Sequence, residues 1–248
     1  MAIFNLFTMK LKIFILITSI FFISIDAQVL YNYPKGQDFY EGGREGFNKD
    51  IQDAAVKSGI KPCEKTEALF MRFIIYPDSQ VKYVADPDTL AVANNKCIKD
   101  KVLGLMKSVK NWKPAELDGN KTAAMFCTLF TDDLLLKNGF SEEEFSKPVY
   151  MYKDKESDIM KFRENFVKCF DSNGYRANLD YSFVINFDVD TKGEAGFFYI
   201  ENQSDLEKFN KMVVDCASNT KKSYWKPSYY KGVPVKQVFR MPIRFNAY

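Results

Sequence analysis

The chain has 248 residues, of which 46% are hydrophobic and 27% charged, a composition that excludes a disordered chain and fits one or two folded domains. A net charge of only +3 gives no reason to expect nucleic acid as a partner, because such binding needs concentrated positive charge. The absence of histidine excludes Ser-His and Cys-His nucleophiles and removes the commonest metal ligand. We therefore expect a non-catalytic protein without a metal or a small-molecule cofactor.

The N-terminus has the pattern of a secretory signal peptide. Lys10 and Lys12 precede an apolar run from Ile13 to Ile25, and the small residue Ala27 follows. We expect cleavage after Ala27, so that residues 1–27 are removed and the mature chain is periplasmic or secreted. The alternative is an uncleaved anchor, which would attach the protein to a membrane. The run is shorter than the ~20 residues that span a bilayer, and this favours cleavage.

The first half of the mature chain predicts a helix, a hairpin, a second helix and a strand. The first helix spans Glu45–Ser58 and stops at Gly59. The second helix carries apolar residues at helical spacing up to Trp112, and Pro114 ends it. The hairpin and the last strand cover residues 70–84 and 122–131.

The second half predicts the same order of elements. A helix over Ser157–Asp171 comes first, and a hairpin over residues 181–200 follows. The next helix runs towards Trp225 and Pro227, and a strand over Val235–Phe245 closes the chain. In Tyr181–Val189, apolar and polar residues alternate, which predicts one buried face and one largely wet face.

A duplicated motif supports an internal repeat. Trp112-Lys113-Pro114 and Trp225-Lys226-Pro227 are 113 positions apart, and each is followed by a glycine at the same distance. We therefore predict an α+β fold of two modules, 28–136 and 156–248, joined by a connecting segment, 137–155. Each module is expected to be a three-stranded antiparallel sheet with two helices on one face. The acidic runs Asp132-Asp133 and Glu142-Glu143-Glu144 are interpreted as solvated surface.

Export permits disulfides between the five cysteines of the mature chain. Their positions in the two halves favour the pairs Cys63–Cys97 and Cys169–Cys216, with Cys127 free in a strand. Free buried thiols are the alternative. A zinc site is not expected, because no two cysteines have C-x-x-C spacing.

Each half resembles the C-terminal domain of TonB, the periplasmic energy transducer, in the form common in Bacteroidetes-type proteins. The motifs that carry the resemblance are Tyr33-Pro34, the turn at Pro77-Asp78, the two Trp-Lys-Pro motifs and the closing stretch Met241–Phe245. The resemblance implies that the last strand lies at a sheet edge and accepts a strand from a partner. No Pro-rich spacer separates residue 27 from the first predicted module, and this favours binding over energy transduction.

We therefore expect an exported, non-catalytic envelope protein that binds a protein or peptide by strand addition. Pro242 independently supports an edge position, because proline cannot donate to a ladder. The residues expected to form this edge are Val238, Phe239, Arg240, Met241, Ile243, Arg244 and Phe245. Two alternatives remain open for the edge: it is merely protected, or it packs on the other module. The alternative function is a TonB-type energy-transducing transport component with the N-terminal segment kept as a membrane anchor.

Overall fold

The computed structural model describes residues 29–136, 142–172, 181–201, 207–219 and 222–245. Within these ranges the protein is a mixed α+β fold with six α-helices and several small antiparallel sheets. The predicted signal peptide lies outside the described residues. None of the described helices is both long and apolar enough to cross a membrane.

The first half forms one three-stranded sheet with helices against it, and one two-stranded sheet. Its helices are α2 (Gly43–Ser58), α3 (Thr89–Asn94), α4 (Lys96–Leu105) and α5 (Asp132–Leu136), and its strands are β1 (Ala68–Ile75), β2 (Val81–Val84), β3 (Ala115–Leu117), β4 (Asn120–Thr122) and β5 (Ala124–Thr131). The chain reverses after α2 at Gly59, which adopts the left-handed conformation with φ 62° that glycine allows.

The second half contains a similar sheet and two further small sheets. Its helices are α6 (Ile159–Ser172) and α7 (Glu207–Ala217), with the short 3₁₀ helix η1 (Glu142–Glu144), and its strands are β6 (Phe145–Ser146), β7 (Val149–Tyr152), β8 (Lys155–Ser157), β9 (Tyr181–Val189), β10 (Ala195–Glu201), β11 (Ser223–Lys226), β12 (Ser228–Tyr230), β13 (Val233–Val235) and β14 (Gln237–Phe245). Strands β6 and β7 lie in the expected connecting segment and pair with β12 and β11.

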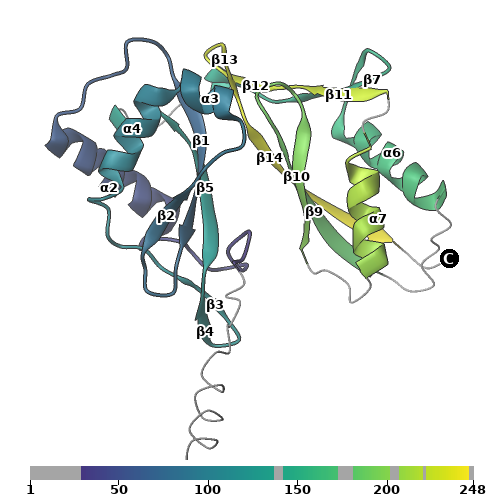
Figure 1. Ribbon diagram of the computed structural model, residues 1–248, viewed down its shortest axis with the longest axis horizontal. Helices are drawn as coiled ribbons and strands as arrows, with labels where there is room; N and C mark the ends of the chain where they lie inside the picture. Colours follow the sequence, from purple (N-terminus) through teal and green to yellow (C-terminus); the bar gives the residue numbers. More distant parts are fainter. Residues whose placement is uncertain (1–28, 137–141, 173–180, 202–206, 220–221, 246–248) are drawn as a thin grey trace, which may run out of the picture.

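The two larger sheets have the same strand order. The first is β2-β1-β5 and the second is β10-β9-β14, so in each of these sheets the strand that comes first in the chain is central (Figure 1). Their registers are equivalent, because Ala124 pairs with the last residue of β1 and Gln237 pairs with the last residue of β9. Ala124 and Gln237 are 113 positions apart, the same interval that separates the two Trp-Lys-Pro motifs.

Each half buries its own aromatic core between its sheet and its helices. In the first half, Phe47 of α2, Val102 of α4 and Phe73 of β1 belong to one buried cluster. In the second half, Phe166 of α6, Val213 of α7 and Phe187 of β9 belong to another. A tryptophan packs on a tyrosine in both cores, with ring centroids 5.1 Å apart for Tyr40–Trp112 and 5.0 Å for Tyr150–Trp225.

The prediction that a helix runs up to each tryptophan is wrong. Helix α4 ends at Leu105 and α7 ends at Ala217, well before Trp112 and Trp225. Trp112 forms an isolated antiparallel bridge with Tyr40, and Trp225 lies in β11 opposite Tyr150. Both tryptophans therefore lie in extended backbone. Each pairs with a strand-like segment that precedes the first helix of its half, and this pairing brings the segment onto the core.

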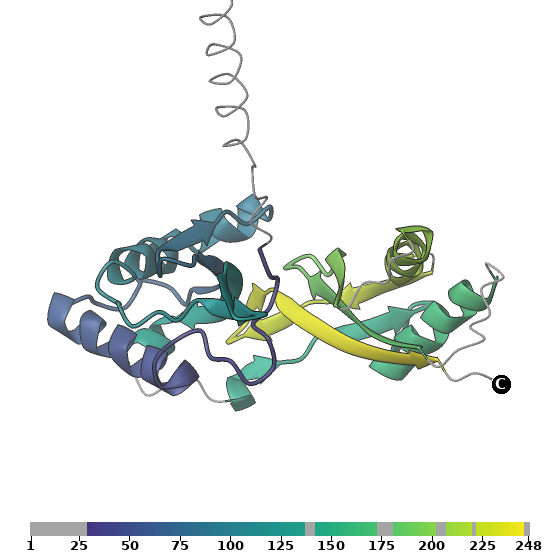
Figure 2. The same cartoon turned by 90° about the horizontal axis from the view of Figure 1, so that it is seen from below.

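The prediction that the sheets have a largely wet second face is also wrong. Figures 1 and 2 show α2 and α4 of the first half and α6 and α7 of the second on opposite outer sides, with the two larger sheets between them. Asn186 and Asp188, on the polar face of β9, are only 1% and 5% exposed. A small apolar cluster joins the halves at this interface, where Leu129 of β5 meets Tyr230 of β12. The alternation of β9 thus reflects two different buried environments.

Replacing Gly193 with alanine should destabilise the second half strongly. Gly193 has φ 85°, and an added Cβ would lie 1.9 Å from the carbonyl oxygen of Trp225. Strain and overlap together should lower the free energy of unfolding by at least about 2 kcal/mol, measured by urea denaturation. The control is Gly232→Ala, which has φ 81° and no atom near the added Cβ. That variant should lose only about 1 kcal/mol, and equal losses would contradict the packing argument.

Candidate functional site

The expected partner-binding strand, β14, is the outer strand of the second sheet. It pairs with β9 along its whole length, from Gln237 opposite Val189 to Phe245 opposite Tyr181. Met241 and Ile243 point into the core, at 3% and 7% exposure. Phe239 packs on Trp225, with ring centroids 4.9 Å apart. Of the expected edge residues, Val238 is half-buried and Arg240 and Arg244 are exposed, while the side chain of Phe245 is not described.

Proline fixes which backbone groups of β14 face away from β9. Antiparallel pairs alternate between hydrogen-bonded and non-hydrogen-bonded positions. Pro242, opposite Val184, has no N–H and occupies a non-hydrogen-bonded position. Its carbonyl oxygen points outward and accepts a hydrogen bond from Arg163 Nη2 of α6 at 2.8 Å. By alternation, the N–H and C=O groups of Val238 and Arg240 also point outward.

Side chains already cover part of this edge. Besides the bond from Arg163, Gln237 Nε2 donates to the carbonyl oxygen of Val238 at 3.1 Å. The Arg240 side chain, 61% exposed, folds back across the sheet and pairs with Glu201 of β10 at 2.8 Å. Burial alone would raise the pKa of Glu201, but hydrogen bonds from Arg240 and Asn186 outweigh it and lower this pKa. The described side-chain bonds thus reach the outward carbonyl groups of Pro242 and Val238, and none of them reaches the outward backbone of Arg240.

The equivalent edge of the first half is occupied by the N-terminal segment of the chain. Leu30 pairs in parallel with Ala124 of β5: its N–H donates to Ala123 O at 2.9 Å, and its C=O accepts from Met125 N–H at 2.8 Å. Met125 is equivalent to Val238 by the 113-residue interval. The outward direction found for Met125 N–H therefore agrees with the direction derived for Val238.

A cluster of four charged side chains lies buried where the two sheets meet. Arg72 of β1 forms an ion pair with Asp188 of β9, and Lys236, just before β14, pairs with Asp86 at 2.7 Å. Arg72 also lies 3.6 Å from Asp86, and the four side chains are only 6–7% exposed. Two positive and two negative charges therefore neutralise one another across the interface. No pattern in the sequence predicts this cluster.

Burial is the largest influence on the pKa of Asp188. It raises the pKa of this carboxyl, although Arg72 and Lys236 act in the opposite direction. The nearby Asp88 accepts a hydrogen bond from the Thr191 hydroxyl at 2.5 Å, which fastens the β9–β10 turn to the segment before α3. The segments Asp86–Asp88 and Asp188–Asp190 would suggest a divalent cation site from their spacing. Here the ammonium and guanidinium groups of the chain itself occupy the space between the carboxylates.

The first acidic run, Asp132-Asp133, is predicted to be solvated surface, but part of it is buried. Asp133 is 8% exposed, and its carboxylate accepts hydrogen bonds from the Tyr230 hydroxyl and from Lys231. Asp132 accepts from the backbone N–H of Cys63 at 2.5 Å and pairs with Lys101 at 2.7 Å. Asp133 therefore holds the second half against α5, whereas Asp132 holds α4 and the loop before β1 against α5 within the first half.

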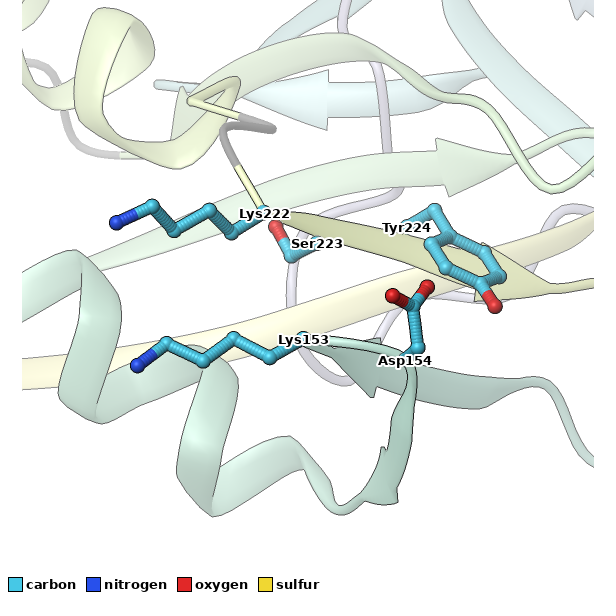
Figure 3. Close-up of a pocket in the computed structure, with 5 residues that line it drawn as sticks. All are labelled: Lys153, Asp154, Lys222, Ser223 and Tyr224. Atoms are coloured by element: carbon cyan, nitrogen blue, oxygen red, sulfur yellow. The ribbon is translucent and has the colours of Figure 1, made fainter.

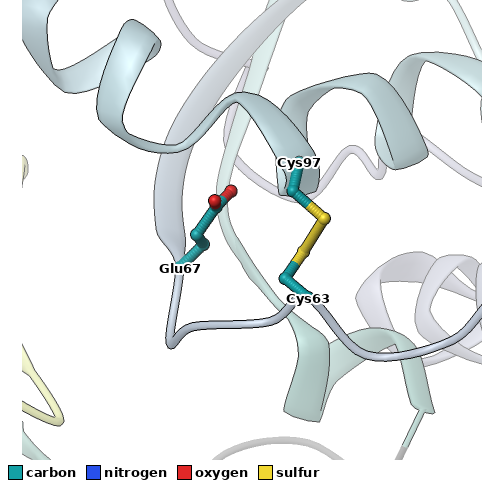
Figure 4. Close-up of side chains that lie close together, drawn as sticks. All are labelled: Cys63, Glu67 and Cys97. Carbon is teal, nitrogen blue, oxygen red and sulfur yellow. A yellow bond between two sulfur atoms is a disulfide. The ribbon is translucent and has the colours of Figure 1, made fainter.

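Both expected disulfides are present, Cys63–Cys97 and Cys169–Cys216, and Cys127 is free. Such bonds are typical of proteins in oxidising compartments. The ligand atoms of Cys63, Glu67 and Cys97 lie within 4.8 Å of one another, but the sulfur atoms are bonded together (Figure 4). Glu67 accepts a hydrogen bond from Ile98 N–H at 2.9 Å, so it caps the start of α4. In this oxidised form the trio offers no thiolate to a metal.

Comparison with protein-family models, with curated proteins and with solved structures finds no match to this chain. The function therefore has to be argued from the geometry described above.

Replacing Lys236 with alanine should destabilise the protein, because it leaves Asp86 buried without its closest positive partner. We expect the free energy of unfolding to fall by about 3 kcal/mol or more, measured by urea denaturation. Lys192 is an exposed lysine of the adjoining turn, and Lys192→Ala is the matched control, with an expected change within about 0.5 kcal/mol. Similar losses in the two variants would show that the cluster contributes nothing specific.

Proposed function

We propose that this is an exported, non-catalytic envelope protein that binds a protein or peptide partner by strand addition at the edge of β14. The observation that carries the proposal is the parallel pairing of Leu30 with β5. Because β5 and β14 hold equivalent places in the two sheets, the chain itself provides an example of the interaction proposed for β14. The resemblance to the TonB C-terminal domain implies the same role for the last strand.

Among the described residues of the second half, no segment occupies the edge of β14 as Leu30 occupies the edge of β5. Tyr150 is equivalent to Tyr40, since both pack on the tryptophan of their half. The chain before Tyr150 forms η1 and β6, and β6 pairs with β12. The described part of this segment therefore runs to the interface between the halves, which leaves the start of β14 for a strand from another molecule.

A partner strand at β14 would also meet an exposed face of α6. Met160 and Val167 are 58% and 37% exposed, and their spacing from Arg163 places all three on one side of the helix. Arg163 reaches the edge of β14, so this apolar face borders the edge. Backbone pairing and apolar contacts to α6 would together recognise an extended segment with apolar side chains on one face.

The experiment compares two substitutions at Arg240. Arg240→Pro removes the outward N–H of the edge, whereas Arg240→Ala removes only the side chain and its pair with Glu201. The probe is a fluorescent peptide with the sequence of residues 28–33, which contains the segment that pairs with β5. Binding to the intact protein, measured by fluorescence anisotropy, should weaken about tenfold or more in Arg240→Pro and change little in Arg240→Ala. Equal binding by the two variants would refute strand addition here.

Removing the Arg163 side chain should strengthen peptide binding. Arg163→Ala frees the outward carbonyl of Pro242, which then becomes available to the partner backbone. One additional hydrogen bond should tighten binding about fivefold in the same anisotropy assay. Lys168→Ala, on the same helix, is the control and should leave the affinity unchanged. Weaker binding in Arg163→Ala would mean that the arginine contacts the peptide instead of covering the edge.

A further inference from the structure

Two turns at one end of the second half bring unpaired lysines together. The β7–β8 turn carries Lys153 and Asp154, which have φ 51° and 60°, and Lys222 precedes β11 with φ 66°. The N–H of Lys153 donates to the carbonyl oxygen of Lys222 at 2.8 Å, so the backbone holds the turns side by side. The lysine side chains extend in the same direction from a shallow hollow (Figure 3).

The surroundings of this corner cancel its basic character only in part. Two neighbouring lysines are paired, Lys226 with Glu156 and Lys161 with Glu164. Neither Lys153 nor Lys222 has a carboxylate within salt-bridge distance among the described residues. The ammonium groups of Lys153 and Lys161 both lie near the ring of Tyr152, at 5.4 Å and 5.1 Å from its centroid.

The shape of the corner favours an extended anionic surface over a small anion. The residues that line the hollow are exposed, apart from the half-buried Ser223, and the ammonium groups project into solvent. A small anion would need fixed, desolvated donors, whereas flexible lysines are suited to a surface that carries many negative charges. Tyr224 lines the same hollow at 46% exposure, and an exposed tyrosine ring suits the boundary between lipid headgroups and water.

We propose that Lys153, Lys222 and Tyr224 form an interaction surface for the anionic face of a lipid bilayer. This surface is separate from the β14 edge, so a partner strand and a bilayer would use different residues of the second half. Asp154 opposes the attraction, because its carboxylate lies in the same hollow and carries no ion pair in the described structure.

The test uses vesicles of phosphatidylglycerol and phosphatidylcholine in equal amounts, with vesicles of phosphatidylcholine alone as the reference. Co-sedimentation of the intact protein should detect binding only to the anionic vesicles, and 0.5 M NaCl should abolish it. Lys153→Gln with Lys222→Gln should weaken binding about 25-fold, because each lysine near an anionic surface contributes about fivefold. Lys192→Gln, at an exposed lysine of the β9–β10 turn, should leave it unchanged.

Removing the negative charge of Asp154 provides a more selective test than removing the lysines. Asp154→Asn removes a negative charge without adding a contact, and it should tighten vesicle binding about fivefold. Unchanged binding in the double lysine variant, or equal binding to both kinds of vesicle, would overturn the proposal. Binding to soluble polyphosphate without binding to vesicles would overturn it as well, and would identify a soluble polyanion as the ligand. Because the double lysine variant leaves β14 intact, its binding of the peptide should be unchanged.

Discussion

The relative position of the two sheets depends on four charges that are buried together. Arg72, Asp86, Asp188 and Lys236 come from four separate segments, and each lies at an interface that water barely reaches. Desolvating one such charge costs several kcal/mol, so the cluster is tolerated only while its members meet. A shift of one sheet relative to the other would leave a buried charge unpaired. Because Lys236 directly precedes β14, the same constraint positions the start of the proposed binding strand. The small apolar cluster around Tyr230 lies at the same interface. Its hydrophobic burial adds to the contact, but unlike the ion pairs it has no preferred direction.

The two halves share a topology but differ in how the chain reaches it. In the first half, the segment from Leu30 to Tyr40 passes along the edge of β5 and then packs on Trp112. In the second half, the preceding segment is continuous with α5 of the first half, and its described part pairs with β11 and β12 before α6 begins. Tyr150 fills the position on the core that Tyr40 fills in the first half. In its described part, however, the segment that carries Tyr150 does not follow the edge of β14. Asn32, two residues after the bridge at Leu30, donates to Glu201 of β10 at 3.0 Å, so the segment before α2 also contacts the second sheet.

Much of the local structure can be predicted from the sequence, because periodicity and turn residues report it directly. The hairpins, the first helix of each half, the disulfide pairs and the outer position of the last strand follow from such signals. The interface between the sheets could not be predicted in this way. The alternation of polar and apolar residues along a strand is the same whether the polar residues face water or a buried residue of opposite charge. Asp188 is therefore predicted to lie on a wet face. Arg72 offers the one available signal, since it is the only charged residue in the otherwise apolar strand Ala68–Ile75. Its partners lie far away in the sequence, and spacing alone does not identify them.

The helix ends were misplaced because Trp112 continues the helical spacing of apolar residues although its backbone is extended.

The structure of the β14 edge limits how a partner could bind there. An exposed edge attracts any extended chain, and proline or charged residues are the usual protection against this. Pro242 removes one donor, and the side chains of Arg163 and Gln237 occupy two acceptors, so few backbone groups remain for a partner. Each net hydrogen bond contributes only about 1 kcal/mol, and so few bonds cannot hold a strand by themselves. Selective binding at this edge therefore requires additional apolar burial, and the exposed residues of α6 beside Arg163 supply a surface for it. An edge protected in this way would resist indiscriminate pairing and would still admit a segment whose side chains match that surface.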